Sequence, residues 1–137
     1  MKIIEEPVTQ ETINNYKDEL FLFNEDIKEL KGKKILKIYS DEGQLVGISM
    51  YSYRLDKEDV ELFLSEYQEK FKGKLCNSLY LDSIYALQRG YNVTNSIITY
   101  LKNKCGDMWL YSHIQAMKFW SNRKDMQYIG ENIFISC

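Results

Sequence analysis

Residues Leu79 to Leu101 read LYLDSIYALQRGYNVTNSIITYL, and this segment indicates how the chain folds. Its first part, Leu79 to Ala86, is rich in β-forming residues and largely apolar on both faces, as a central strand requires. The polar residues Gln88 to Asn92 break that pattern. From Val93 the apolar residues recur at spacings that place them on one side of a helix. The segment therefore predicts a buried strand, a tight turn and an amphipathic helix.

The turn between this strand and this helix has the chemistry of an anion site. A helix that begins at the carboxyl end of a strand leaves backbone N–H groups, and the positive end of its dipole, facing whatever lies above the sheet. Asn92 is the candidate N-cap, with Thr94 as the alternative. An ordinary strand–turn–helix joint capped by Asn92 would have the same sequence, so the residues alone leave both interpretations open.

The segment resembles the acetyl-CoA signature of the GNAT superfamily of N-acetyltransferases. In that family a strand leads to Arg or Gln, two residues, Gly, one residue, and Gly or Ala, and the loop amides hold the pyrophosphate of CoA. Arg89 matches the first position, whereas Asn92 and Thr94 stand where the two small residues are expected. The resemblance implies that CoA is bound by Arg89, Gly90, Tyr91, Asn92, Val93, Thr94 and Asn95.

The two replaced glycine positions change what the loop can do. Glycine lets a backbone approach phosphates closely, whereas Asn adopts a left-handed conformation at modest strain and Thr does not. We therefore expect a weaker grip on CoA than a glycine loop gives. We also expect Thr94 Oγ1 to donate a hydrogen bond to a phosphate.

A second segment extends the resemblance. Trp109 to Ser112 is typical of a strand, and His113 to Trp120 of a short helix. This is similar to the family's later segment, in which a strand leads to Asn, two residues, Ala, two residues, an apolar residue and Tyr. Ala116 fits that pattern, while His113 replaces the Asn and Trp120 replaces the Tyr.

The resemblance implies an α/β fold of the α+β kind. Its central sheet is expected to be mixed, mostly antiparallel and built from about six or seven strands, with helices on both faces. Residues 1–137 are expected to form one domain, because the chain has the length of one and lacks repeats, low-complexity segments and linkers.

Periodicity predicts the remaining elements. They are an edge strand over Lys2 to Glu5 that Pro7 ends, one helix or two in sequence from about Gln10 to Leu30 capped by Thr9, a hairpin of Lys34 to Tyr39 and Gln44 to Tyr53, a helix over Asp56 to Phe71, and a final strand over Gln127 to Ser136.

The resemblance also implies where acetyl transfer occurs. In the family the fourth and fifth strands splay apart, pantetheine lies between them, and a backbone N–H of the fourth strand polarises the thioester carbonyl. Leu79 to Ala86 would be the fourth strand and Trp109 to Ser112 the fifth. The donor would then be the N–H of Ile84 or of Ala86.

Three side chains are candidates for proton transfer, which this chemistry needs at the amine and at the leaving thiolate. Asp82 lies in an apolar strand, where burial would raise its pKa toward that of a general base; a structural Asp bonded to backbone or facing the open side of the sheet is the alternative. Tyr111 either carries a proton to or from the thiol or packs in the fold. His113 either bonds pantetheine and relays protons or caps a helix.

Trp120 stands where family members often have a Tyr that acts as general acid. An indole N–H does not titrate usefully, so Trp120 would instead pack against CoA or in the core. Water or Tyr111 would then have to supply the proton.

Composition limits the other possibilities. The formal net charge of −2 and the absence of a Lys/Arg cluster argue against a nucleic-acid partner. No apolar run predicts a membrane span and no signal peptide is evident, so the expected compartment is the cytoplasm. One His and three scattered Cys predict no metal site. The abundance of Lys, Asn, Ile and Tyr hints at an AT-rich bacterial genome or one of its phages.

Two functions agree with the sequence. The first is an acetyl-CoA-dependent N-acetyltransferase whose acceptor is a small-molecule amine or the amino group of a peptide or protein. The second is a catalytically silent GNAT-like binding or regulatory module, borne by a phage. The sequence shows neither the acceptor nor whether the chain forms a homodimer.

Overall fold

The structure is a computed structural model that describes residues 1–20, 22 and 27–137. Its internal contacts group the chain into two compact units, and each is described here by itself. Strand β4 (Leu79–Ala86) and helix α4 (Val93–Cys105) contribute to both units. The first unit comprises Met1–Ser52 and Asp82–Tyr100, and the second comprises Tyr53–Leu81 and Leu101–Cys137.

The first unit is built on an antiparallel sheet. Strand β1 (Lys2–Pro7) pairs with β2 (Lys33–Tyr39), which pairs in turn with β3 (Leu45–Ser52). The segment that follows β4 lies beside β3, where Leu87 N–H donates to the carbonyl oxygen of Val46 at 2.9 Å. The predicted edge strand, hairpin and central strand are therefore confirmed.

Helix α1 (Gln10–Tyr16) begins where the sequence predicts. Thr9 is its N-cap, because Thr9 Oγ1 accepts a hydrogen bond from Thr12 N–H at 3.2 Å. The continuation of the helix to Leu30 is wrong for residues 17–20 and 27–30, which form turns, and for Leu22, which is in no helix. The rest of that prediction, at residues 21 and 23–26, lies outside the described residues.

The prediction failed because the apolar residues of this segment are buried without forming a helix. Leu20, Leu22 and Leu30 are at most 2% exposed, and they lie in the same core cluster as Ile13 of α1. Their helical spacing therefore marks residues that turn toward one core, and it does not require a continuous helix.

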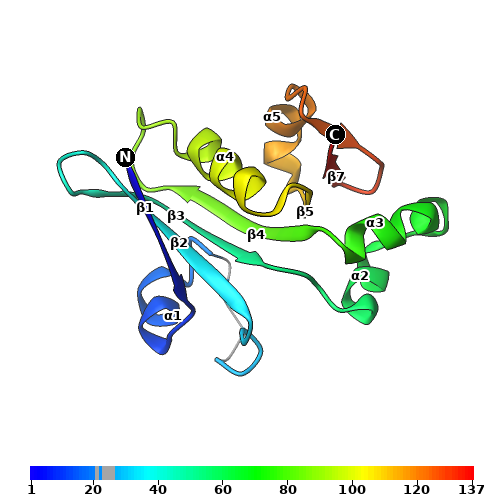
Figure 1. The fold of residues 1–137 in the computed structure, drawn as a ribbon, viewed down its shortest axis with the longest axis horizontal. Coiled ribbons are helices and arrows are strands. Elements are labelled where there is room, and N and C mark those ends of the chain that lie inside the picture. Colours follow the sequence, from blue (N-terminus) through cyan, green and yellow to red (C-terminus); the bar gives the residue numbers. More distant parts are fainter. Residues whose placement is uncertain (21, 23–26) are drawn as a thin grey trace. The chain divides into compact units, whose positions relative to one another are not determined.

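Different helices cover the two faces of this sheet, as Figure 1 shows for α1 and the first turns of α4. Ile13 of α1 packs with Ile35 and Ile48 on one face. Position 47 faces the opposite way, since side chains alternate along a strand. A Cβ built on Gly47 would lie 2.4 Å from Cγ1 of Val93. The first residue of α4 therefore rests directly on the backbone of β3.

The second unit contains the start of β4 and the remaining strands of the sheet. Leu79 and Tyr80 of β4 pair in parallel with Met108 and Trp109 of β5 (Met108–Tyr111). β5 pairs antiparallel with β7, and β7 pairs antiparallel with β6. In the part of the chain that the structure describes, the order β1-β2-β3-β4-β5-β7-β6 makes a seven-stranded, mostly antiparallel sheet, as predicted.

The last predicted strand is a hairpin. β6 (Met126–Tyr128) and β7 (Ile133–Ser136) replace the single strand expected over Gln127 to Ser136, so that prediction is wrong. The turn between them has positive φ angles at three successive residues. They are Gly130 at 94°, Glu131 at 51° and Asn132 at 67°.

The predicted helix over Asp56 to Phe71 is also divided. α2 (Lys57–Phe63) ends before Ser65, which forms a capping box with Gln68 and so starts a new helix. That helix, η1 (Glu66–Phe71), is of the 3₁₀ type. Tyr67, which a continuous helix would place on the same face as Val60 and Phe63, is 87% exposed.

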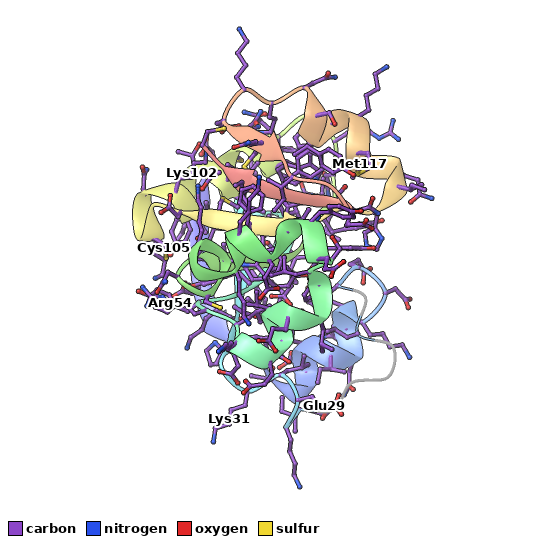
Figure 2. The ribbon with its side chains drawn as sticks, turned by 90° about the vertical axis from the view of Figure 1, so that its right-hand side faces the viewer. Glu29, Lys31, Arg54, Lys102, Cys105 and Met117 are labelled. Carbon is purple, nitrogen blue, oxygen red and sulfur yellow. The ribbon has the colours of Figure 1, made fainter. Side chains whose placement is uncertain are left out.

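Helices of this unit cover β4, β5 and β7 (Figure 2, green ribbons). α3 (Lys72–Cys76) follows η1 directly, and its Leu75 packs in one cluster with Val60 of α2 and Trp109 of β5. Two short helices follow β5, η2 (Ile114–Ala116) and α5 (Met117–Ser121). Among the described residues, no helix has the length and apolar character needed to cross a membrane.

Replacing Gly47 by Ala should lower the free energy of unfolding by about 1–3 kcal/mol, because the new methyl group overlaps Val93 and the strand or helix must shift. Urea unfolding measures the loss, and adding Val93→Ala should recover part of it. Gly73→Ala in α3 is the matched control, since its Cβ meets nothing within 4 Å and should stabilise by up to about 1 kcal/mol. A Gly47→Ala variant as stable as the parent would contradict the close contact.

Candidate functional site

The carboxyl end of β4 is held to β3 through one set of its peptide groups. The carbonyl oxygen of Ser83 accepts from Ser49 Oγ at 2.6 Å, and Leu87 N–H bonds Val46. Residues 83 and 87 thus direct their peptide groups toward β3. Because peptide groups alternate in direction along a strand, we infer that the amides of Ile84 and Ala86 point to the other edge of β4.

Segment 87–92, called here the entry loop, leads from β4 into α4. Gly90 has a φ of 90° and Asn92 a φ of 54°, so both adopt the left-handed conformation. The carbonyl oxygen of Asn92 accepts from Ser96 N–H at 3.1 Å, which starts the helix. Asn92 therefore occupies the predicted cap position, although an N-cap residue normally has an extended backbone. Its Oδ1 accepts from Asn95 Nδ2 at 2.6 Å.

Some residues in and beside the entry loop are exposed to solvent, and others are buried in the core. Arg89, Gly90 and Asn92 are exposed, whereas the side chain of Val93 is buried on Gly47. Only backbone of Val93 could therefore contribute to a ligand site. As the first residues of α4, Val93 and Thr94 have N–H groups that precede the first helical donor, Ser96 N–H. These groups and Arg89 make the entry loop an electropositive surface.

Asp82 lies in a buried ion pair. Its carboxylate bonds Lys33 Nζ, at the start of β2, and accepts from Ser52 Oγ at 2.9 Å. Lys33 Nζ also bonds Ser52 Oγ at 3.2 Å. The side chains of Lys33 and Asp82 are only 19% and 11% exposed. The Asp82 carboxylate is thus held by side chains of two other strands, and the sequence pattern identified neither partner.

Burial raises the pKa of Asp82 above its ordinary value, and the charge of Lys33 and the hydrogen bonds from Lys33 and Ser52 oppose that rise. The direction is the one that the sequence predicts for a general base. Asp82 lies on the α1 face of the sheet with Ser52, so by strand alternation Ser83 faces the α4 side. Ser83 Oγ is buried without a hydrogen-bond partner among the described residues.

The other predicted site residues belong to the second unit. Tyr111 is 45% exposed and its ring centroid lies 5.7 Å from that of Phe63. His113 is exposed and precedes η2, where its carbonyl oxygen accepts from Ala116 N–H at 3.0 Å. Trp120 is buried in the second unit, with Phe119 edge-on at 5.0 Å.

Most of the predicted residues, from Asp82 to Asn95, thus belong to the first unit, whereas Tyr111, His113 and Trp120 belong to the second. The structure brings Lys33 and Ser52 to Asp82. No group of three or more His, Cys, Asp or Glu residues that could hold a metal ion occurs in the described ranges.

Comparison with solved structures identifies the fold. The N-acetyltransferase YlbP of Bacillus subtilis, solved in complex with coenzyme A, matches with a TM-score of 0.59 and 13% identity over 98% of this chain and 94% of that chain. A GNAT-family acetyltransferase of Listeria monocytogenes matches with a TM-score of 0.59 and 11% identity over 98% and 92% of the two chains. One from Staphylococcus aureus gives 0.54 and 10% over 98% of each.

The chain therefore has the fold of the GNAT superfamily, as the two sequence segments predicted. No protein-family model and no curated protein matches the sequence.

Replacing Lys33 by Met should cost about 3 kcal/mol of folding free energy at pH 7, because it leaves the buried Asp82 carboxylate without its cation. A carboxyl group whose pKa is raised in the folded state contributes stability below its unfolded pKa and loses it as pH rises through the folded pKa. The loss should therefore shrink between pH 7 and pH 4, as Asp82 becomes protonated.

Urea unfolding at the two pH values measures this change. Lys34→Met is the matched control and should stay within about 0.5 kcal/mol of the parent, since no ion pair of Lys34 is present among the described residues. The double variant Lys33→Met, Asp82→Asn should lose less than Lys33→Met alone. An equal loss at both pH values would show that the ion pair is not the cause.

Proposed function

We propose that the protein is an acetyl-CoA-dependent N-acetyltransferase that acts on a small amine or on a protein amino group by direct attack. The structure of the entry loop is the observation that supports this proposal most directly. In a GNAT fold, this loop joins a strand whose Ile84 and Ala86 amides point away from β3 to a helix whose first N–H groups are open to an anion.

The diphosphate of CoA is assigned to the entry loop and the first turn of α4. Gly90 and Asn92 are left-handed there, and a Cβ on Gly90 would meet nothing within 4 Å, so the loop backbone is accessible. Arg89 supplies a positive charge, and Thr94 Oγ1 and the amides of Val93 and Thr94 supply donors. The neighbouring Tyr91 and Asn95 complete the proposed binding segment.

Pantetheine is assigned to the edge of β4 that faces away from β3. The amides of Ile84 and Ala86 point to that edge, and either of them would polarise a carbonyl oxygen there. These amides would donate hydrogen bonds to the carbonyl oxygens of an extended pantetheine chain.

The protein's side chains would then move the protons. Acetyl-CoA supplies a thioester, whose carbonyl carbon the acceptor nitrogen attacks while the carbon–sulfur bond breaks. Asp82 takes the proton that the amine must lose, and Tyr111 returns a proton to the sulfur. His113 is the alternative relay. Trp120 is buried beside Phe119, which supports packing in the core over the alternative contact with CoA.

A silent binding module is the second candidate, and the Asp82 ion pair favours it. Asp82 already holds the ammonium group of Lys33, so an acceptor amine must compete with Lys33 for that carboxylate. A module of this kind would bind CoA at the entry loop without transferring the acetyl group.

Binding to the entry loop can be tested through Arg89. Acetyl-CoA at a hundred times its dissociation constant should add about 2.7 kcal/mol to the stability measured by thermal denaturation. Arg89→Ala should raise the dissociation constant about tenfold, because one charge-assisted contact to phosphate is lost. Arg54→Ala, another exposed arginine, is the matched control and should leave binding unchanged. No stabilisation by millimolar acetyl-CoA or CoA would refute the proposed cofactor site.

Catalysis can be tested separately through Asp82. Asp82→Asn should lower kcat for acetylation of an amine about 10²–10⁴-fold while leaving acetyl-CoA affinity unchanged, since the amide cannot accept the proton. Release of CoA thiol over a panel of amines measures turnover. Stabilisation by acetyl-CoA without thiol release for any amine in the panel would favour the silent module.

A further inference from the structure

The second unit contains a cavity that the proposed cofactor site does not use. It has a volume of about 420 Å³ and is lined by Leu62, Phe63, Leu64, Ser65, Tyr111 and Glu131. Its wall therefore combines the end of α2, the segment before η1, the last residue of β5 and the β6–β7 turn.

Most of this wall is apolar and uncovered. Leu62 is 84% exposed and Tyr111 is 45% exposed, although both are large apolar side chains. The ring of Phe63 supports Tyr111 from one side, and it also packs edge-on against the buried Trp109 at 5.3 Å. A firmly supported aromatic wall beside an exposed leucine favours a ligand with an apolar body.

Glu131 gives the cavity a negative charge. It is exposed, and no cation lies within ion-pair distance of it in the described part of the chain. Its backbone has a φ of 51°, between the left-handed Gly130 and Asn132. A glutamate is an unfavourable residue for this conformation, in which Gly, Asn or Asp is more common. The turn therefore carries a free carboxylate at a position where the backbone favours other residues.

A buried side chain fixes the backbone of this turn. Gln68 is 1% exposed, and its Nε2 donates to the carbonyl oxygens of Gly130 at 2.5 Å and Ile129 at 3.2 Å. Asn132 N–H donates to the hydroxyl of Tyr128 at 3.2 Å. Strained backbone of this kind persists where the surroundings determine it, and it is concentrated at functional sites.

We propose that this cavity of the second unit binds a primary amine attached to an apolar body, such as an arylalkylamine. The ammonium group pairs with Glu131, and the apolar body lies on Leu62 and the rings of Phe63 and Tyr111, whose faces also attract the cation. A hydrophilic polyamine would satisfy the charge but would leave the apolar wall in water.

Binding is tested on the full chain without acetyl-CoA, so that it does not depend on turnover. Isothermal titration with phenethylamine should give a dissociation constant of about 1 mM or lower. 2-Phenylethanol, which lacks the charge, and putrescine, which lacks the apolar body, should each bind at least about tenfold more weakly. Equal binding of all three compounds, or no binding of phenethylamine, would overturn the proposal.

Two variants locate the site. Glu131→Gln keeps the size of the side chain and should weaken phenethylamine binding about tenfold, whereas Glu66→Gln, at another exposed glutamate, should not change it. Leu62→Ser should weaken binding of phenethylamine about threefold through lost apolar contact and leave putrescine unaffected. Circular dichroism confirms that each variant folds. Unchanged affinity in both Glu131→Gln and Leu62→Ser would place the ligand elsewhere.

This amine site and the proposed enzyme are tested separately. Phenethylamine that binds in a Glu131-dependent way supports the amine site whether or not it is acetylated.

Discussion

The contact between Val93 and Gly47 is the constraint on which the candidate cofactor site depends. Helix α4 begins on the backbone of β3, at a distance that any side chain at position 47 would prevent. With the start of the helix fixed, the entry loop has only a few residues in which to leave β4 and reverse direction. The left-handed Gly90 and Asn92 achieve that reversal. The same contact buries Val93, so that the loop offers its backbone outward and its apolar side chain inward.

The segment from Leu79 to Leu101 predicted the centre of the fold because its pattern is local. A strand that is apolar on both faces and a helix with one apolar side can each be recognised without knowing their partners. The spacing of apolar residues gave a wrong helix where residues in turns reach a common core, as Leu20 and Leu30 do. It also gave one helix in place of two where a capping box at Ser65 starts a new one. It also failed at the β6–β7 turn, where the non-glycine residues Glu131 and Asn132 adopt positive φ angles.

For the candidate site too, the sequence predicted only what a local pattern contains. The entry loop is contiguous, so a motif could indicate it, and Asp82 was recognisable as a charge in an apolar strand. Its partners come from other strands. Lys33 and Ser52 face each other in the register of the β2–β3 hairpin, which the predicted hairpin could have suggested. That both reach Asp82 depends on how β4 lies against β3, and a sequence pattern does not contain this information. The result is a general-base candidate whose availability depends on a lysine.

The division of the chain into units that share β4 and α4 has a consequence for how the protein is made. Each unit consists of two separate segments, so neither is complete when the first of its segments leaves the ribosome. The β1–β3 meander can form early from local pairing. It must then wait for residues 82–100 before its sheet and second face are finished. During that interval the β3 backbone around Gly47 is uncovered, and an exposed strand edge is a surface on which nascent chains associate. Slow translation between residues 52 and 82 would prolong this vulnerable state.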